Sequence, residues 1–135
     1  MTLNPKAKDY MKSQKEQLVN EIKMAFPNVP FYEDEIAEDE EKKFVKGKYL
    51  AFVLSMGDFS PNENESVLSQ DVFIDYYSEN RDDVDEMILD IIATMKKVKT
   101  FKFVSAEKVR ARVKDTKRFI DVVSIEFRRS LKVGC

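Results

Sequence analysis

The sequence has no histidine, one cysteine and three glycines among its 135 residues. Without histidine, it lacks the commonest general base of enzymes and the commonest ligand of transition metals. Zinc sites of cysteine and histidine, and nucleophiles activated by a histidine partner, are therefore excluded. The glycines have no spacing that resembles a phosphate-binding loop or a dinucleotide-binding turn. We therefore expect a protein that is not an enzyme and that binds no metal and no cofactor.

Cys135, the last residue, is the single cysteine, so no disulfide can form within the chain. A free thiol fits a reducing compartment such as a bacterial cytoplasm. The sequence contains no apolar run of about 18 residues, so we expect no membrane partner. Residues 1–17 lack the apolar core of a signal peptide. The chain, residues 1–135, is long enough for a single domain with a hydrophobic core.

Charge is divided unevenly along the chain, although the net charge is only −2. Residues 1–95 contain 10 Lys and Arg against 21 Asp and Glu, which is a net charge of −11. Residues 96–135 contain 13 Lys and Arg against 4 Asp and Glu, which is a net charge of +9. Such a division bears on the partners and orientation of the protein more than on its fold.

Two segments have the periodicity of amphipathic helices. Residues 5–26 place apolar side chains at helical spacing in a narrow stripe, and Pro27 ends the segment. Residues 81–98 have a continuous apolar face, formed by Val84, Met87, Ile88, Ile91, Ile92, Met95 and Val98. We expect this second helix to lie flat against a sheet.

The other apolar segments are predicted to be strands. They are residues 29–35, 49–56 and 66–78, residues 101–105, which the segment 108–114 either continues or follows as a new strand, and residues 119–131. In the last of them, Phe119, Val123, Ile125 and Phe127 are expected to face the core. Together the elements predict an α+β fold, with a mainly antiparallel sheet of about four to five strands packed by two helices on one side. The predicted order is α-β-β-β-α-β-β.

Two polar segments are predicted to be mobile loops. Residues 33–48 contain seven acids and four bases, with few large apolar groups. Residues 57–66 are rich in turn residues and include one aromatic residue, Phe59. Each segment is either a plain surface loop or a loop that orders against a neighbouring molecule, in which case Phe59 is the anchor.

The sequence KVRARVK at residues 108–114 alternates basic and apolar side chains. Lys108, Arg110, Arg112 and Lys114 share one parity, and Val109, Ala111 and Val113 share the other. In a strand, this alternation produces one positive face and one dry face. With a turn at residues 115–118, the segment forms a hairpin with the last strand, and the outer face of this hairpin is basic.

Several motifs add to this order of elements. AFPNVPFY closes the first helix at residues 25–32, VFIDYYSENRDDVDEMILDII leads from a strand into the second helix at residues 72–92, and the last hairpin is rich in Arg and Lys. In these features the chain resembles the tail-completion, or tail-terminator, proteins of long-tailed phages, a family that includes tail-to-head joining proteins. The resemblance covers about residues 15–131.

The resemblance implies a structural protein of the virion that is not an enzyme. Such proteins form a homohexameric ring at the head-proximal end of the tail. One face of the ring would meet the tail tube protein, and the other would meet the head-completion (stopper) protein of the capsid connector. Viral DNA would pass through the middle. Assembly would take place in the host bacterial cytoplasm, and the polar loops favour a monomer before assembly.

We predict that complementary charge contributes to the ring contacts. The predicted interface residues are Lys108, Arg110, Arg112, Lys114 and Arg118 on the basic side, Glu38, Asp39, Glu40 and Glu41 on the acidic side, and Phe59. A heterologous contact pairs two different surfaces and closes a ring when the rotation fits. A second acidic candidate consists of Asp71, Asp75, Asp82 and Asp83. The alternative is that acids and bases pair within one molecule as cross-strand ion pairs.

Two other classes of function stay open. The first is sequence-independent DNA binding, in which the basic hairpin, including Lys117, contacts several phosphates. The aromatic residues nearby, Phe101, Phe103 and Phe119, are expected in the core and not as a stacking platform. The second is an enzyme in which Asp71, Asp75 and Asp121 hold Mg²⁺. Asp71 and Asp75 would lie roughly 13 Å apart along one strand, which is too far for a single ion.

Overall fold

A computed structural model describes residues 5–63, 66–113 and 116–132. Its elements, in chain order, are α1 (Pro5–Ala25), β1 (Phe31–Glu33), α2 (Glu38–Glu41), β2 (Leu50–Pro61), β3 (Val67–Ser78), α3 (Val84–Met95), β4 (Phe101–Arg112) and β5 (Phe119–Lys132). The predicted order is confirmed, and the short helix α2 is an addition within the acidic segment. Whether residues 101–105 and the segment from residue 108 form one strand or two is open in the sequence, and in the structure they belong to one strand, β4.

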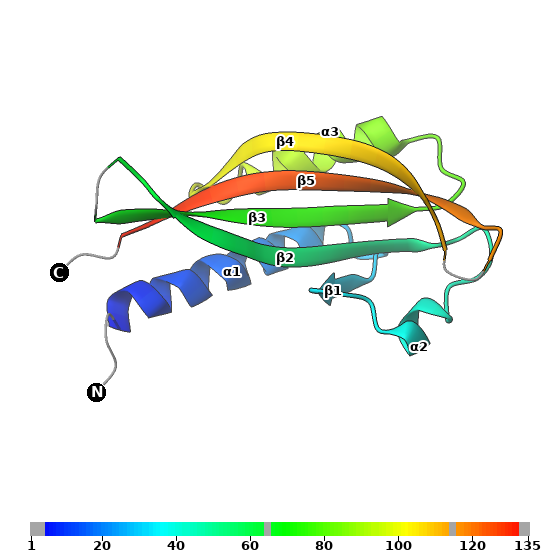
Figure 1. The fold of residues 1–135 in the computed structure, drawn as a ribbon, viewed down its shortest axis with the longest axis horizontal. Helices are drawn as coiled ribbons and strands as arrows, with labels where there is room; N and C mark the ends of the chain where they lie inside the picture. Colours follow the sequence, from blue (N-terminus) through cyan, green and yellow to red (C-terminus); the bar gives the residue numbers. More distant parts are fainter. Residues whose placement is uncertain (1–4, 64–65, 114–115, 133–135) are drawn as a thin grey trace.

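The strands form one five-stranded sheet in the order β1-β2-β3-β5-β4 (Figure 1). Neighbouring strands are antiparallel except β1 and β2, which are parallel. Helices α1 and α3 lie on the same face of the sheet and contact each other there. The predicted α+β class, with two helices on one side of a mainly antiparallel sheet, is therefore confirmed. β1 and β4 form the two edges of the sheet.

The main core lies between this face of the sheet and the two helices. Alternate residues of the central strands belong to it, among them Phe52, Leu54, Ile74, Tyr76, Val123, Ile125 and Phe127. Helix α1 contributes Leu18 and Ile22, and helix α3 contributes Ile91 and Met95. The periods of about 2 in strands and about 3.6 in helices thus bring apolar residues of distant segments into one layer.

A buried arginine holds α1 on the sheet. Arg129 of β5 is only 2% exposed. Its Nε and Nη2 donate to Gln70 Oε1 at 2.8 and 2.6 Å, and its Nη1 donates to Gln14 Oε1 at 3.2 Å. Because burial removes water from the guanidinium, it lowers the pKa of Arg129. Hydrogen bonds from this one side chain join α1, β3 and β5.

The predicted loop at residues 57–66 is wrong in its bounds. β2 extends to Pro61, and only residues 62–66 separate it from β3. The register between the two strands shifts between Met56 and Phe59, so the residues between them form a bulge inside the ladder. A Cβ atom on Gly57 would lie 2.8 Å from the carbonyl oxygen of Asp71. Gly57 contributes to the turn-like composition of this segment, but its lack of a side chain instead allows β2 and β3 to approach closely.

The segment predicted as a loop at residues 33–48 includes packed apolar side chains. Ile36 and Phe44 belong to a second apolar cluster around Tyr49, Val113 and Ile120. The ring of Phe44 stacks on that of Tyr49, with the centroids 4.5 Å apart. This cluster is separate from the main core, because strands expose side chains on both faces of a sheet.

Two aromatic residues predicted in the core are exposed. Phe103 is 46% exposed and Phe119 is 50% exposed, whereas Phe101 is buried. Both exposed residues belong to the ladder between β4 and β5, at the edge of the sheet. The prediction is wrong for these two because alternation indicates the face of the sheet on which a side chain lies but not whether another element covers it there.

Candidate interaction surface

The basic residues of β4 point to the helix side of the sheet. Lys108 lies opposite Val123, which belongs to the core beneath the helices. Arg110 and Arg112 share the parity of Lys108 and so the same face. An ion pair of 2.7 Å between Lys108 Nζ and Asp85 Oδ1 of α3 agrees with this direction. A row of positive charge therefore runs along the edge of the sheet beside α3.

The opposite parity of β4 is not the dry face that the sequence predicts. Val109 is 53% exposed, Ala111 is half-buried, and Val113, just after the strand, is buried. The second apolar cluster includes Val113 and Ala111 but not Val109. The apolar row of the strand is thus covered only toward the turn that leads to β5.

The predicted basic residues differ in what they contact. Arg110 lies over the ring of Phe119, with its guanidinium carbon 5.5 Å from the ring centroid. Arg112 is exposed. The bond to Asp85 raises the pKa of Lys108, and this pair supports the alternative of pairing within one molecule, although the acid lies on a helix. Lys114 lies outside the described residues.

Arg118 is bound within the molecule to Glu79. Its Nη2 and Nε donate to the two carboxylate oxygens of Glu79 at 2.6 and 3.0 Å. The backbone N–H groups of Gly47 and Tyr49 donate to the same carboxylate at 3.0 and 3.1 Å. Gly47 has a φ of +84°, which a residue without Cβ adopts easily. The Arg118 side chain, together with these N–H groups, holds the pKa of Glu79 below its ordinary value.

Glu79 carries no local signal in the sequence that marks it. It follows β3 directly, and its partner Arg118 precedes β5, 39 residues later. An isolated acid at the end of an apolar strand is the one available hint, because such a residue is buried only when it is paired. The sequence also does not reveal that Phe103, Val104 and Val109 are exposed.

The acidic residues lie on the β1 side of the sheet, whereas β4 forms the other edge (Figure 1). Residues 33–41 contain seven acids and no base. Glu38 and Asp39 are exposed in α2. Glu40 pairs with Lys43 at 3.1 Å, and Glu41 accepts a hydrogen bond of 2.9 Å from the Tyr49 hydroxyl. The exposed pair is therefore better placed to meet another molecule.

The outer edge of β4 combines charge with exposed apolar side chains. Val104 is 41% exposed, in addition to Phe103, Val109 and the nearby Phe119. Among the described residues no strand pairs with this outer side, so part of the β4 backbone has no partner in the sheet. Such an edge is a template for a partner, and lysines and bulges are the usual protection. β4 has both, with an irregularity between Phe103 and Ser105.

The second acidic candidate is not one continuous patch. Asp71 pairs with Arg128 of β5 at 3.1 Å, and Asp83 pairs with Arg81 at 2.7 Å. Asp75 lies inside the sheet, between Val53 of β2 and Ser124 of β5. Within the part of the chain that the structure describes, no group of three or more acids or cysteines is close enough to hold a metal ion.

Burial makes Asp75 a costly charge. Loss of water raises its pKa, and a hydrogen bond with Ser124 opposes this rise. When the pKa of a carboxyl is higher in the folded chain than in the unfolded chain, the folded protein loses stability as pH rises through the folded pKa. We therefore expect Asp75→Asn to raise the free energy of unfolding at neutral pH by about 1 kcal/mol, measured by urea denaturation.

The matched control is Asp71→Asn, on the same strand face. Asp71 is paired with Arg128, so this change should give no gain in stability. The difference in free energy of unfolding between Asp75→Asn and the wild type should also shrink as pH falls, because Asp75 becomes protonated and loses its charge. A variant less stable than the wild type at neutral pH would show that the charge of Asp75 is compensated.

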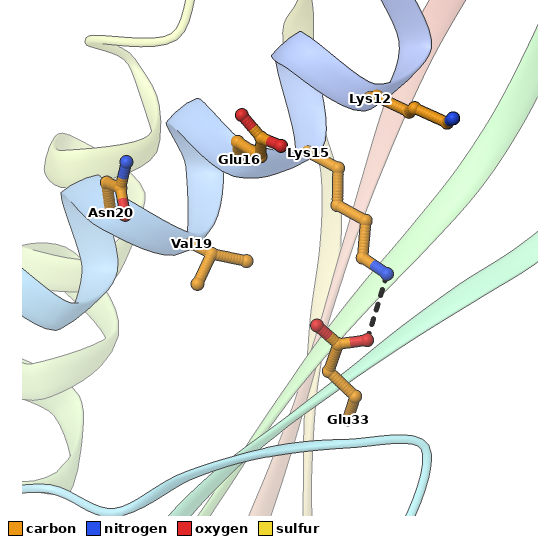
Figure 2. Close-up of a pocket in the computed structure, with 6 residues that line it drawn as sticks. All are labelled: Lys12, Lys15, Glu16, Val19, Asn20 and Glu33. Carbon is orange, nitrogen blue, oxygen red and sulfur yellow. Dashed lines mark hydrogen bonds and ion pairs between the residues drawn. The ribbon is translucent and has the colours of Figure 1, made fainter. Parts of the chain in front are cut away.

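A cavity of about 460 Å³ lies between α1 and β1 (Figure 2). It is lined by Lys12, Lys15, Glu16, Val19, Asn20 and Glu33. Lys15 reaches from α1 to Glu33, and the two side chains form an ion pair of 2.9 Å (Figure 2). The charges of this lining are mixed, with two lysines and two glutamates. The ion pair of Lys15 and Glu33 joins α1 to β1 across this cavity.

The described helices include none that has both the length and the apolar character to cross a membrane. A comparison with models of known protein families found no family that matches this chain. A search of curated proteins found no similar sequence.

Proposed function

We propose that this protein is a structural component of a phage virion, which forms a homohexameric ring at the head-proximal end of the tail. The ring caps the tail tube protein and joins it to the head-completion protein of the capsid connector, with viral DNA passing through the centre. The observation that carries the proposal is that the two edges of one sheet bear opposite charges. β4 has four bases and one acid, whereas residues 33–41 are purely acidic among their charged groups.

Opposite charges at opposite edges favour a heterologous contact. The β4 edge of one copy would face the acidic segment of the next, and six such contacts close a ring. Exposed apolar groups on β4 add the anchors that charge alone does not provide, since charge mainly determines orientation and encounter rate. Before assembly the protein is a monomer, and the end of the tail acts as the template.

The experiment that tests the proposal is negative-stain imaging of phage particles made without this protein. Tails of abnormal length would indicate a terminator of tail growth. Tails of normal length that fail to attach to filled capsids would indicate a joiner of tail and head. Complete, infectious particles without the protein would exclude both roles.

Phe59 is predicted to anchor a contact between subunits or with a tail protein. It is 49% exposed near the end of β2, beside the bulge. Because about half of the Phe59 side chain is exposed to solvent, Phe59→Ala should lower the free energy of unfolding by about 1 kcal/mol or less. It should reduce the yield of infectious particles about tenfold or more, as expected for a buried aromatic anchor at an interface.

The matched control for this change is Leu89→Ala in α3, because Leu89 is 68% exposed and lies on another surface. It should affect neither the melting temperature nor the particle yield. If Phe59→Ala lowers thermal stability as strongly as it lowers yield, Phe59 is a core residue and not an anchor.

A further inference from the structure

A second cavity, of about 750 Å³, opens where the turn before β5 meets the loop before β2. Its charged lining consists of Lys46, Arg110, Lys117, Arg118 and Glu79, and Phe119 forms part of its wall. These residues come from segments that are far apart in the sequence. Their convergence is a property of the tertiary structure, and Arg110 belongs both to this lining and to the basic row of the proposed ring contact.

The described lining carries a net positive charge, with four cations against one acid. Among the described residues of the lining, Glu79 is the one acid, and it is already bound by Arg118 and by two backbone N–H groups. Lys46, Arg110 and Lys117 are exposed. Within the described residues, no ion pair engages any of these three. Three cations that have no ion pair among the described residues therefore surround the pair of Glu79 and Arg118, whose charges cancel.

The floor and one wall are held in place by contacts inside the molecule. Glu79 is 5% exposed, and its ion pair with Arg118 measures 2.6 Å. On the wall, the guanidinium of Arg110 lies over the ring of Phe119. Lys46 and Lys117 have long side chains with rotatable bonds and lie beside this fixed pair, so they can adjust to a ligand that presents several oxygens.

We propose that this cavity binds phosphate groups, with Lys46, Arg110 and Lys117 as the contacting residues. A phosphodiester backbone or a free polyphosphate spreads negative charge over several oxygens, and this matches three cations from separate segments. A carboxylate of an acidic peptide fits less well, because the guanidinium fork best suited to it, that of Arg118, is occupied by Glu79. The volume is in the range of sites for small organic ligands.

The test compares the wild-type protein with Lys46→Gln/Lys117→Gln. Binding of a fluorescently labelled DNA duplex is followed by anisotropy at several salt concentrations. Three phosphate contacts predict a slope of about −3 for the logarithm of the binding constant against that of salt, and the double variant should reduce its magnitude by about 2. In parallel, inorganic pyrophosphate should raise the melting temperature of the wild type and not that of the variant.

The matched control is Lys48→Gln/Lys102→Gln, which removes the same charge from exposed lysines outside the cavity. It should keep the wild-type slope and the response to pyrophosphate. Responses to both probes identify the DNA backbone as a source of the phosphate, and a response to pyrophosphate alone identifies a free phosphate compound.

Three results would overturn the proposal. The first is that neither probe responds, and the second is that the control loses as much binding as the cavity variant. The third is that a peptide of residues 33–41 stabilises the protein and pyrophosphate does not, which would assign the cavity to an acidic protein segment.

Discussion

Replacing Arg110 and Arg112 of β4 with Glu should reduce the yield of infectious particles by about a hundredfold or more. Both side chains are exposed on the basic row of the edge strand. In the proposed ring, this row faces the acidic segment of the next subunit, so the change replaces attraction with repulsion. Like charges brought together at an interface cost several kcal/mol, and about 1.4 kcal/mol already corresponds to a tenfold loss. Plaque titres and negative-stain images of the particles measure the effect.

The decisive control is a charge exchange. Glu38→Lys/Asp39→Lys on the acidic segment should be as harmful alone as the change on β4, because it also opposes like charges. Combining the two pairs should restore much of the yield, since attraction returns with reversed signs. This rescue distinguishes a contact between the two edges from loss of the phosphate cavity, which the acidic segment does not line.

A further control reverses the same number of charges away from the edge, with Lys97→Glu/Lys99→Glu after α3. Both lysines are exposed, and the yield should stay near that of the wild type. Tail joining in vitro should also weaken as salt rises, because the screening length shortens to about 3 Å at 1 M. Tail joining that survives reversal of both arginines would remove the β4 edge from the ring contact.

Replacing Glu79 with Gln should lower the free energy of unfolding by about 3 kcal/mol at neutral pH, because Arg118 then keeps a poorly solvated charge without a counter-ion. Glu79 is almost fully buried, and its carboxylate receives four hydrogen bonds. In a chain of this size, such a loss lowers the melting temperature by about 10 °C. Differential scanning calorimetry and urea denaturation measure both quantities.

The pH dependence gives a second measurement of the same contact. The pKa of Glu79 is lowered in the folded protein from its ordinary value of 4.5, first of all by the hydrogen bonds from Arg118. Its contribution is therefore fully present above this ordinary value and is lost as pH falls through the lower, folded value. The stability difference between wild type and Glu79→Gln should shrink over the same acidic range.

The exposed Glu38→Gln serves as the control for Glu79→Gln. Glu38 makes only a 3.8 Å ion pair with Lys42 on the surface, and such pairs contribute about 1 kcal/mol at most. A Glu79→Gln variant as stable as Glu38→Gln, with an unchanged pH profile, would show that water replaces the carboxylate beside Arg118.

Local patterns in the sequence predict the main helices and strands of this fold and their order, although not the short helix α2. In α3, apolar residues recur at helical spacing, and β2, β3 and β5 have the apolar runs and alternation of strands. These patterns are local, because the geometry of one element dictates which of its own residues share a face. The separation of negative and positive charge along the chain is equally a property of the sequence.

Which strand forms an edge of the sheet depends on the tertiary structure. The alternation in β4 is the same whether its apolar row is covered or not, so Val109 is predicted to be buried although it is exposed. Phe119 of β5 is exposed for a similar reason, because alternation indicates the face of a side chain but not what covers that face. Residues 57–61 likewise have the composition of a turn, but in the structure they belong to β2, and Phe59, Ser60 and Pro61 pair with β3. Which strand lies beside which depends on burial and hydrogen bonding summed over the whole sheet. For the same reason, the contact of Glu79 with Arg118 and the cation-lined cavity beside it arise only when distant segments meet.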